Sequence, residues 1–334
     1  MRNFDIPVVI FIFKRKKILS IIERISIVKP KKLYIISDNG RNDEEKKMVS
    51  ECRKLVENSI NWDCEIIKNY AMENRGVYEN IGIGAKWVLA REKWAIFLED
   101  DNLPEVTFFE FCQKMLHKYE NDTRILWICG TNYLGKYEQD NGYTYVFTKH
   151  MLPCGWASWS NKFNKFYDGD LKLCSDTSIL NRVKKEYFDA TLFEQYKENW
   201  MSEYNKIKNG EKPASWDYQM DFCIKSNNVY GICPCNNQIK NIGVDDDSIH
   251  GGTSFSNIMT KRFCSMESYP IEFPIKNPPL ILTDLKFEKK IAKILKYPYT
   301  LRMKKNISRF IRKILNINEN TRIKEIIHIR RENL

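Results

Sequence analysis

Three consecutive acidic residues, Glu99, Asp100 and Asp101, directly follow a short apolar segment at residues 94–98. Such a segment, bounded by charge, is typical of a strand that is buried on both faces of a parallel sheet. Open α/β sheets bind ligands at the carboxyl ends of their strands, which is where these acids lie. Neighbouring carboxylates repel one another unless a cation neutralises them, and Mg²⁺ or Mn²⁺ reaches proteins through carboxylates and substrate phosphates. The segment therefore predicts a metal site that holds a phosphorylated ligand, with a solvated acidic turn as the alternative.

Three other polar residues stand where they could contact such a ligand. Asp38 follows an apolar segment and could accept hydrogen bonds from a ribose or a base edge, although Asp-Asn-Gly also forms turns unaided. Arg75 precedes a helical pattern, so its guanidinium and the nearby backbone N–H groups would suit a diphosphate; the alternative is a surface arginine in a turn. His250 could complete the metal shell, although a lone histidine more often has another role.

Tryptophans occur in two segments that could form the remainder of a site. The rings of Trp156 and Trp159, with Ala157 between them, could stack on a sugar, although paired tryptophans more often pack in a core. Asp217 stands at the predicted start of a helix, where it could act as a general base beside the water-excluding indole of Trp216. An acidic residue in the first turn is also favoured by the helix dipole alone.

The apolar periodicity predicts that strands and helices alternate through the first half of the chain. Such alternation indicates βαβ units and a parallel sheet flanked by helices, whereas the second half, with a strand at 125–129 and an aromatic run at 143–147, indicates a mixed sheet. Pro104 is expected at a helix start, where it is tolerated. The expected strands are 6–13, 33–37, 62–68 and 94–98, and the expected helices are 16–28, 43–58, 76–91 and 104–119.

The composition narrows the class of protein. With 334 residues, 43% of them apolar, the chain can bury a full core, and no apolar run approaches the roughly 18 to 20 residues that span a bilayer. The ten cysteines are scattered singly, which predicts reduced thiols and a cytoplasmic protein. No phosphate-binding P-loop motif is present.

The net charge of +11 is concentrated in residues 286–334, which hold 15 Lys and Arg against 4 Asp and Glu. The body is therefore neutral, which argues against nucleic acid as a partner and for one localised electrostatic contact. In the tail, apolar residues recur at helical spacing, with basic residues on or beside the remaining surface. Such a helix could rest on an anionic membrane, which would make the protein peripheral on the inner face of the cytoplasmic membrane; the alternative is a helix docked on the body. The apolar stripe is Ile307, Phe310, Ile311, Ile314 and Leu315, and the basic residues are Lys304, Lys305, Arg309, Arg312 and Lys313.

Taken in chain order, these segments resemble the bacterial inverting glycosyltransferases of the GT-A fold, of the type grouped in glycosyltransferase family 2. The resemblance implies an α/β, GT-A (Rossmann-like) fold, in which a mixed, mainly parallel sheet is flanked by helices and followed by a C-terminal helical extension. The matching residues are Pro7–Arg15, Ser37–Gly40, Asn74–Gly76 with Asn80, Glu99–Asp101, Gly155–Trp159, Trp216–Gln219, and Asn241–Gly243 with His250.

The resemblance also implies how the chain is organised. Residues 1–135 would form the nucleotide-sugar-binding half of one domain, and residues 136–267 its acceptor-binding half. Residues 268–285, which contain four prolines, would form a linker, and residues 286–334 the basic amphipathic helical tail.

The implied activity is metal-dependent transfer of a sugar, with inversion, from a nucleotide diphosphate sugar to a hydroxyl of a glycan or polyprenyl-linked glycan. A UDP-sugar is the commonest donor in such enzymes. Asp101 and His250 would hold Mn²⁺ or Mg²⁺, and Asp217 would be the general base. The donor-binding residues would be Phe13, Arg15, Asp38, Arg75, Asn80, Glu99 and Asp100. The sugar and acceptor contacts would be Trp156, Ala157, Trp159 and Trp216.

Two alternatives stay open at this point. A sugar-1-phosphate nucleotidyltransferase would share the nucleotide-binding sheet and the metal, but it calls for a glycine-rich first loop, and residues 13–16 are basic without a glycine. A non-catalytic, membrane-associated scaffold with a degenerate transferase fold would turn over no donor. The released product separates the enzymes, because glycosyl transfer yields a nucleoside diphosphate and nucleotidyl transfer yields pyrophosphate.

Overall fold

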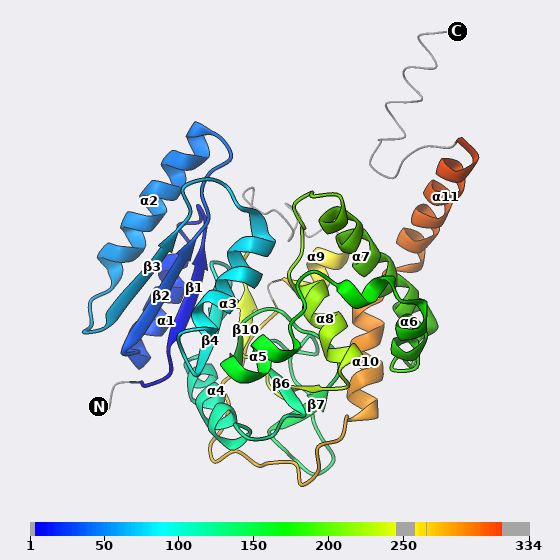
Figure 1. The fold of residues 1–334 in the computed structure, drawn as a ribbon. Helices are drawn as coiled ribbons and strands as arrows, with labels where there is room; N and C mark the ends of the chain where they lie inside the picture. Colours follow the sequence, from blue (N-terminus) through cyan, green and yellow to red (C-terminus); the bar gives the residue numbers. More distant parts are fainter. Residues whose placement is uncertain (1–3, 245–257, 265, 316–334) are drawn as a thin grey trace. The chain divides into compact units, whose positions relative to one another are not determined.

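The computed structural model of the protein describes residues 4–244, 258–264 and 266–315. The chain divides into two compact units, Met1–Leu295 and Lys296–Leu334. The first unit is an α/β domain built on a large mixed sheet (Figure 1).

The sheet has eight strands in the order β3-β2-β1-β4-β8-β6-β9-β7. Six strands run in the same direction, and β8 and β7 pair antiparallel with their neighbours. This mainly parallel sheet, flanked by helices, confirms the predicted fold class. The strands are β1 (Val8–Ile12), β2 (Lys32–Ser37), β3 (Glu65–Tyr70), β4 (Trp94–Glu99), β6 (Ile125–Cys129), β7 (Tyr145–Thr148), β8 (Trp156–Trp159) and β9 (Tyr230–Pro234). A separate antiparallel pair joins β5 (Asn102–Pro104) to β10 (Ile239–Asn241).

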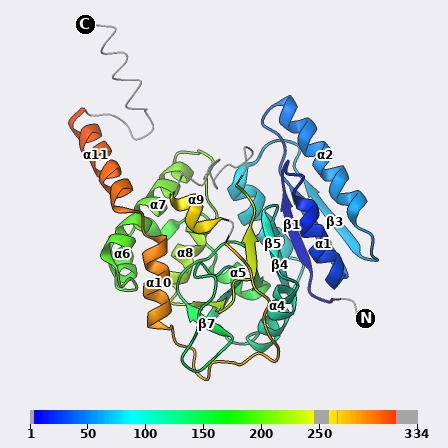
Figure 2. The same ribbon diagram turned by 180° about the vertical axis from the view of Figure 1, so that it is seen from behind.

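Alternating side chains of the central strands feed two hydrophobic cores, one on each face of the sheet. In β1, Val9 and Phe11 enter one core, whereas Val8, Ile10 and Ile12 enter the other. The second core is covered by α1 (Ile18–Val28), α2 (Asp43–Ser59) and α4 (Val106–Lys118). The first core is covered by α3 (Gly84–Leu89), α5 (Ser160–Phe166), α6 (Thr177–Lys184), α7 (Ala190–Lys208) and α8 (Asp217–Ser226). Views from the two sides show both helical layers (Figure 1, Figure 2). The remaining helical segments of this unit are a π-helical turn at Tyr78–Ile83, a 3₁₀ turn at Lys172–Ser175, α9 (Ile258–Phe263) and α10 (Leu285–Leu295).

Several element boundaries differ from the predictions, and the helix predicted at 76–91 is observed as a π-helical turn at Tyr78–Ile83 followed by α3. The predicted strand at 62–68 is observed as β3, which begins at Glu65, since Trp62 is anchored before it by an indole N–H donated to the Pro30 carbonyl at 3.1 Å. Pro104 does not start a helix. It ends β5, which pairs with β10, and α4 begins at Val106.

The described part of the predicted tail, residues 286–315, contains two helices with different environments. Its first helix, α10, belongs to the α/β unit because Phe287 and Ile291 are fully buried in the first core. The Asp284 carboxylate accepts hydrogen bonds from the backbone N–H groups of Lys286 and Phe287, at 2.9 and 3.0 Å, and so caps this helix. The second helix, α11 (Tyr299–Leu315), lies in the second unit.

The segment at 268–285, predicted as a linker, is tied to the body by hydrogen bonds along its length. The backbone N–H of Ile271 donates to Thr107 Oγ1 at 3.1 Å, and that of Lys276 donates to Thr144 Oγ1 at 2.9 Å. Residues 268–285 therefore run as a strap that leads to α10. Within the described residues, none of the helices has the length and apolar content needed to cross a bilayer. The predicted division of the body into halves at 1–135 and 136–267 stays a prediction.

Candidate functional site

A cavity of about 430 Å³ opens at the carboxyl ends of β1, β2 and β4. Its volume lies within the range of about 300 to 1,000 Å³ that is usual for small-molecule sites. Both acidic and basic side chains reach it from distant parts of the sequence. The lining residues are Phe11–Arg15, Asp38, Arg41, Asn74, Gly76, Val77, Asn80, Ile81, Glu99–Asp101 and Lys212–Ala214.

Two of the three acidic residues share one guanidinium in this cavity. Arg15 Nη1 donates to Asp100 Oδ1 at 3.1 Å and to Asp101 Oδ2 at 2.9 Å. Asp100 Oδ2 also accepts the backbone N–H of Phe13 at 3.1 Å, so the end of β1 is joined directly to the end of β4. Burial raises the pKa of Asp100 to about 7, although the charge of Arg15 acts in the opposite direction.

Glu99, the last residue of β4, lines the same cavity, and its side chain makes no hydrogen bond or ion pair with the described residues. Burial, followed by the negative charges of Asp101, Asp100 and Asp217, raises its pKa well above the usual value. Three carboxyl groups thus lie close to Arg15, which contacts the two at Asp100 and Asp101. Such a group of carboxylate oxygens fits a hard divalent cation.

The predicted metal ligands are only partly described. Across residues 4–244, 258–264 and 266–315, no group of three or more His, Cys, Asp or Glu side chains could hold a metal by itself. Mg²⁺ often uses only one or two carboxylates together with substrate phosphates, and Asp101 with its neighbours fits that mode. His250 lies outside the described residues.

The segment Asn241–Gly243 lies against Asp101. The backbone N–H of Ile242 donates to the Asp101 carbonyl at 2.8 Å. A Cβ atom at Gly243 would come within 2.3 Å of Asp101 Oδ2, so only glycine permits this approach without moving the carboxylate. The sequence segment that leads toward His250 thus reaches the acidic residues.

Asp38 lines the cavity, but its carboxylate is occupied by the protein itself. Oδ1 accepts the backbone N–H groups of Asn39 and Arg75, both at 2.8 Å. Oδ2 accepts Asn74 Nδ2 at 3.1 Å and the backbone N–H of Gly76 at 2.9 Å. In the structure its acceptor sites hold the loop at 74–76, and the prediction that this carboxylate binds a ribose or a base stays a prediction. The backbone N–H groups of Arg75 and Gly76, which were expected to face a diphosphate, donate to Asp38 instead.

The Arg75 guanidinium is also turned toward the protein. It donates to Asn80 Oδ1 at 2.8 and 3.1 Å and to Asn69 Oδ1 at 3.1 Å, and Arg75 is not among the residues that line the cavity. These contacts give no support to the predicted role of Arg75 in phosphate binding, which stays a prediction. Asn80 does line the cavity, where it accepts from Arg75.

Three further cations, Lys14, Arg41 and Lys212, line the cavity beside Arg15. None of them was predicted as a site residue. Lys14 and Arg41 both pair with Glu45, and hydrogen bonds from Arg41 lower the pKa of Glu45 to about 2. Lys212 Nζ donates to the Asn74 carbonyl at 2.7 Å and so joins two rims of the cavity. Lys14 and Arg41 follow the ends of β1 and β2, a signal that sequence alone contains. Lys212 has no such signal, because the connection from α7 to α8 brings it there.

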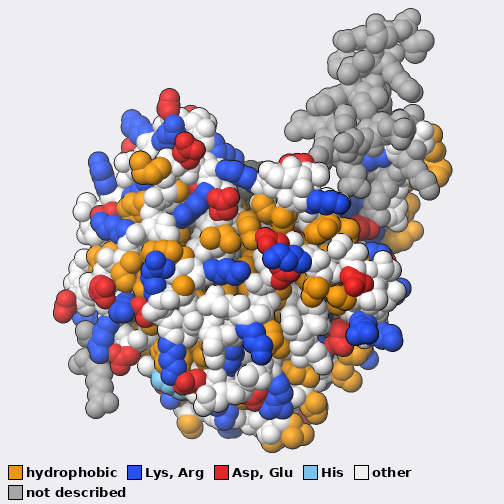
Figure 3. Space-filling model, in the orientation of Figure 1, with side chains coloured by type: hydrophobic (Ala, Val, Ile, Leu, Met, Phe, Trp, Pro, Cys, Tyr) orange, Lys and Arg blue, Asp and Glu red, His pale blue; other side chains and the backbone are white. Residues whose placement is uncertain are grey.

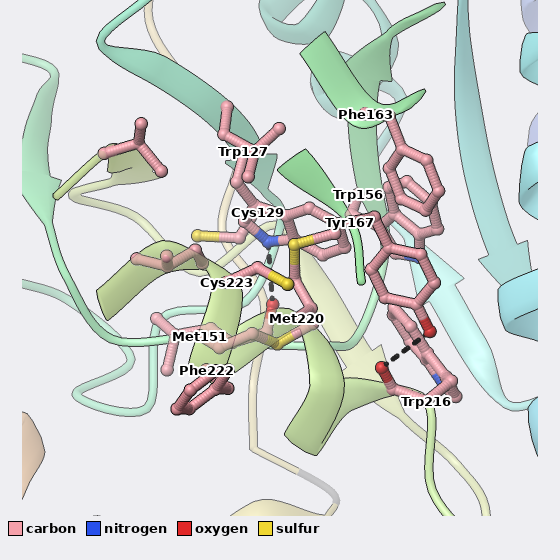
Figure 4. Packing of buried hydrophobic residues seen from close by; sticks show 14 of the residues in the cluster. Trp127, Cys129, Met151, Trp156, Phe163, Tyr167, Trp216, Met220, Phe222 and Cys223 are labelled. Carbon is pink, nitrogen blue, oxygen red and sulfur yellow. Dashed lines mark hydrogen bonds between the residues drawn. The ribbon is translucent and has the colours of Figure 1, made fainter. Parts of the chain in front are cut away.

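The tryptophans predicted to contact a sugar fill the cores. Trp156 is 1% exposed and stacks on Phe97 and Trp127, with ring centroids 3.9 and 4.3 Å away. Figure 4 shows Trp156 packed beside Trp127 among buried side chains. Trp159 is also 1% exposed and donates its indole N–H to the Leu116 carbonyl at 2.9 Å. Ala157, between them, is fully buried. The prediction that these three residues bind substrate is wrong, because β8 is an interior strand and both of its faces are covered.

Trp216 is buried beside Trp156, and the Tyr167 hydroxyl donates to the Trp216 carbonyl at 3.2 Å (Figure 4). Its predicted contact with substrate is therefore also wrong, and its role is to fix the start of α8. Asp217, the first residue of α8, is half-buried and accepts a hydrogen bond from Ser215 Oγ at 2.6 Å. It lies near enough to Glu99 for its charge to raise the pKa of Glu99.

These contacts predict that Asp38→Ala destabilises the fold as well as the site. The substitution leaves three backbone N–H groups without an acceptor, so we expect the free energy of unfolding to fall by about 2–4 kcal/mol. Chemical denaturation measures this loss, with Asp63→Ala as a control at an exposed carboxylate. A side chain that only contacted a ligand would leave the unfolding midpoint unchanged, and that result would contradict the anchoring role.

Comparisons with known proteins give little beyond this geometry. No model of a protein family matches the chain, and no curated protein matches it in sequence. Among solved structures, it is similar to 4-diphosphocytidyl-2C-methyl-D-erythritol synthase from Anaerococcus prevotii, at 9% identity and a TM-score of 0.30. That match covers 68% of this chain and 99% of the other. A likeness at this level carries no argument about activity.

Proposed function

We propose that the protein is an enzyme that transfers a sugar from a nucleotide diphosphate sugar to a hydroxyl of a glycan or polyprenyl-linked glycan. A UDP-sugar is the donor that we expect. The observation that carries the proposal is the cavity at the carboxyl ends of β1, β2 and β4, where Glu99, Asp100 and Asp101 face a group of cations. Carboxylates that can hold a divalent cation, placed beside cations that can hold phosphates, suit a nucleotide diphosphate.

The donor diphosphate is expected beside the basic residues of the cavity. Lys14, Arg15, Arg41 and Lys212 provide positive charge there, and none of them comes from the segment at 74–76 that the sequence suggested. Asp101 would hold Mn²⁺ or Mg²⁺, which when bound would neutralise charge on the departing nucleotide. Phe13 and Arg15, at the end of β1, lie where a nucleoside would meet the protein.

Asp217 is proposed to accept the proton of the acceptor hydroxyl. As that oxygen attacks the anomeric carbon, the bond from this carbon to the phosphate oxygen breaks and a nucleoside diphosphate leaves, which inverts the anomeric configuration. The position of Asp217 at the start of α8, within electrostatic reach of Glu99, supports this role. Burial of the neighbouring Trp216 excludes water from one side.

Nucleotidyl transfer is a second candidate, favoured by one observation. Lys14 and Arg15 follow β1 and line the cavity, where such an enzyme would need cations for the departing pyrophosphate. The absence of glycine from residues 13–16 argues against it.

Product analysis tests both candidates. We would first screen nucleotides and nucleotide sugars with Mn²⁺ by thermal shift, because a ligand of the native state raises the melting temperature. The purified protein would then be incubated with each donor that binds. Release of a nucleoside diphosphate supports glycosyl transfer, whereas formation of pyrophosphate from a nucleoside triphosphate and a sugar phosphate overturns it in favour of nucleotidyl transfer. Absence of both binding and turnover would favour the non-catalytic scaffold.

A further inference from the structure

The two helices that follow the strap both have one apolar face, but these faces have different environments. In α10, Phe287 and Ile291 are fully buried and Leu295 is 8% exposed. In α11, Ile307 is 52% exposed and Phe310 is 67% exposed. Met303 and Ile314, on the same face of α11, are 44% and 65% exposed. The tail that the sequence presents as one amphipathic segment thus contains one helix packed in a core and one that exposes a continuous apolar stripe.

The sequence of α11 is also basic. Its seventeen residues include six Lys and Arg and no Asp or Glu. Lys304 and Lys305 are exposed, and Lys305 Nζ lies 4.0 Å from the centre of the Tyr297 ring. Orange side chains lie along the coloured part of α11 in Figure 3. The helix thus combines large exposed apolar side chains with a sequence that is basic and contains no acidic residue.

We propose that α11 binds the surface of an anionic lipid membrane, with its apolar stripe at the boundary of the acyl chains and its basic residues at the headgroups. Three properties select this partner. A helix with a strong apolar face and a basic polar face partitions into membrane interfaces, and anionic lipids attract its charges. Six like charges on each copy oppose pairing with a second α11. A stripe of Met, Ile and Phe gains nothing from a phosphate backbone, which disfavours nucleic acid. The inference does not rest on the proposed reaction.

The test compares binding of full-length protein to vesicles of phosphatidylcholine alone and of phosphatidylcholine with phosphatidylglycerol. We expect sedimentation with the anionic vesicles, little with the neutral ones, and weaker binding as salt is raised. The double variant Ile307→Glu with Phe310→Glu should bind at least about tenfold more weakly, because it interrupts the apolar stripe. The matched control is the double variant Thr300→Glu with Asn306→Glu at two exposed polar positions of α11, which adds the same two acidic side chains while retaining the apolar stripe and every basic residue. It should still sediment better than the stripe variant.

A second measurement separates membrane binding from other uses of the stripe. The stripe variant should keep the melting temperature and the oligomeric state of the unmodified protein. A lower melting temperature, with no vesicle binding by the unmodified protein, would show that α11 docks on the α/β unit and would overturn the proposal. Loss of a dimer in the stripe variant would overturn it in favour of a second copy. Vesicle binding by the stripe variant at the level of the unmodified protein would also overturn it.

Discussion

The substitution Asp217→Asn is expected to lower kcat by about a thousandfold while the affinity for the donor stays close to that of the unmodified protein. The amide has nearly the same shape as the carboxylate and can still accept the hydrogen bond from Ser215 Oγ. It cannot accept the proton of an attacking hydroxyl. The change therefore removes a function needed only as the reaction proceeds, and it should appear in kcat and not in ground-state binding.

Steady-state kinetics and calorimetric titration of the donor measure these two quantities separately. Ser215→Ala serves as a graded comparison, because it removes the hydroxyl that donates to Asp217 and leaves the carboxylate in place. We expect a much smaller loss of turnover for Ser215→Ala than for Asp217→Asn. Turnover of the Asp217 variant within about tenfold of normal would require a different base, since loss of general-base catalysis costs about a hundredfold or more.

The sequence predicts the scaffold of this site well because the scaffold depends on local patterns. The continuous apolar runs of β1 and β4 are enough to place both strands in a sheet, and the acids after β4 are then brought to its carboxyl end. The start of α8 at Asp217 is likewise marked locally, by Pro213 and Ser215 before it and by the acidic residue in its first turn. These features required no knowledge of distant contacts.

The partners of the polar side chains could not be predicted in the same way. Asp38 and Arg75 were each expected to face a ligand, but in the fold the carboxylate of one accepts the backbone N–H of the other. The sequence gives the hydrogen-bonding capacity of both residues and says nothing of the distance between their loops. Lys212 shows the converse, because a residue with no distinguishing neighbours reaches the cavity through the path of the chain.

The aromatic residues and the tail show a related limit. Trp156 and an exposed indole look alike in sequence, and only the pairing of β8 between β4 and β6 buries it. Similarly, α10 and α11 have similar apolar periodicity, yet one is packed in the core and the other exposes its stripe. Periodicity identifies a face of a helix but does not identify what covers that face.

The substitution Asp101→Asn is expected to weaken Mn²⁺-dependent donor binding by about a hundredfold, as loss of a charged partner at a buried ionic site costs several kcal/mol. Asp101 Oδ1 accepts Asn102 Nδ2 at 2.6 Å and Oδ2 accepts Arg15 Nη1 at 2.9 Å, so the carboxylate is already oriented in the cavity. The amide keeps the volume of the side chain but removes its charge. Asp140→Asn is the control, because that carboxylate is 93% exposed.

Calorimetric titration of the donor, with and without Mn²⁺, also separates the roles of Asp101 and Arg15. If Asp101 holds a divalent cation, Mn²⁺ should strengthen donor binding in the unmodified protein and in the control but not in Asp101→Asn. If the positive charge comes from Arg15 alone, Arg15→Met should abolish donor binding at every Mn²⁺ concentration, and the unmodified protein should bind the donor equally well without the ion. That second outcome would remove the metal from the proposed reaction and leave the guanidinium between Asp100 and Asp101 as the cation that meets the diphosphate.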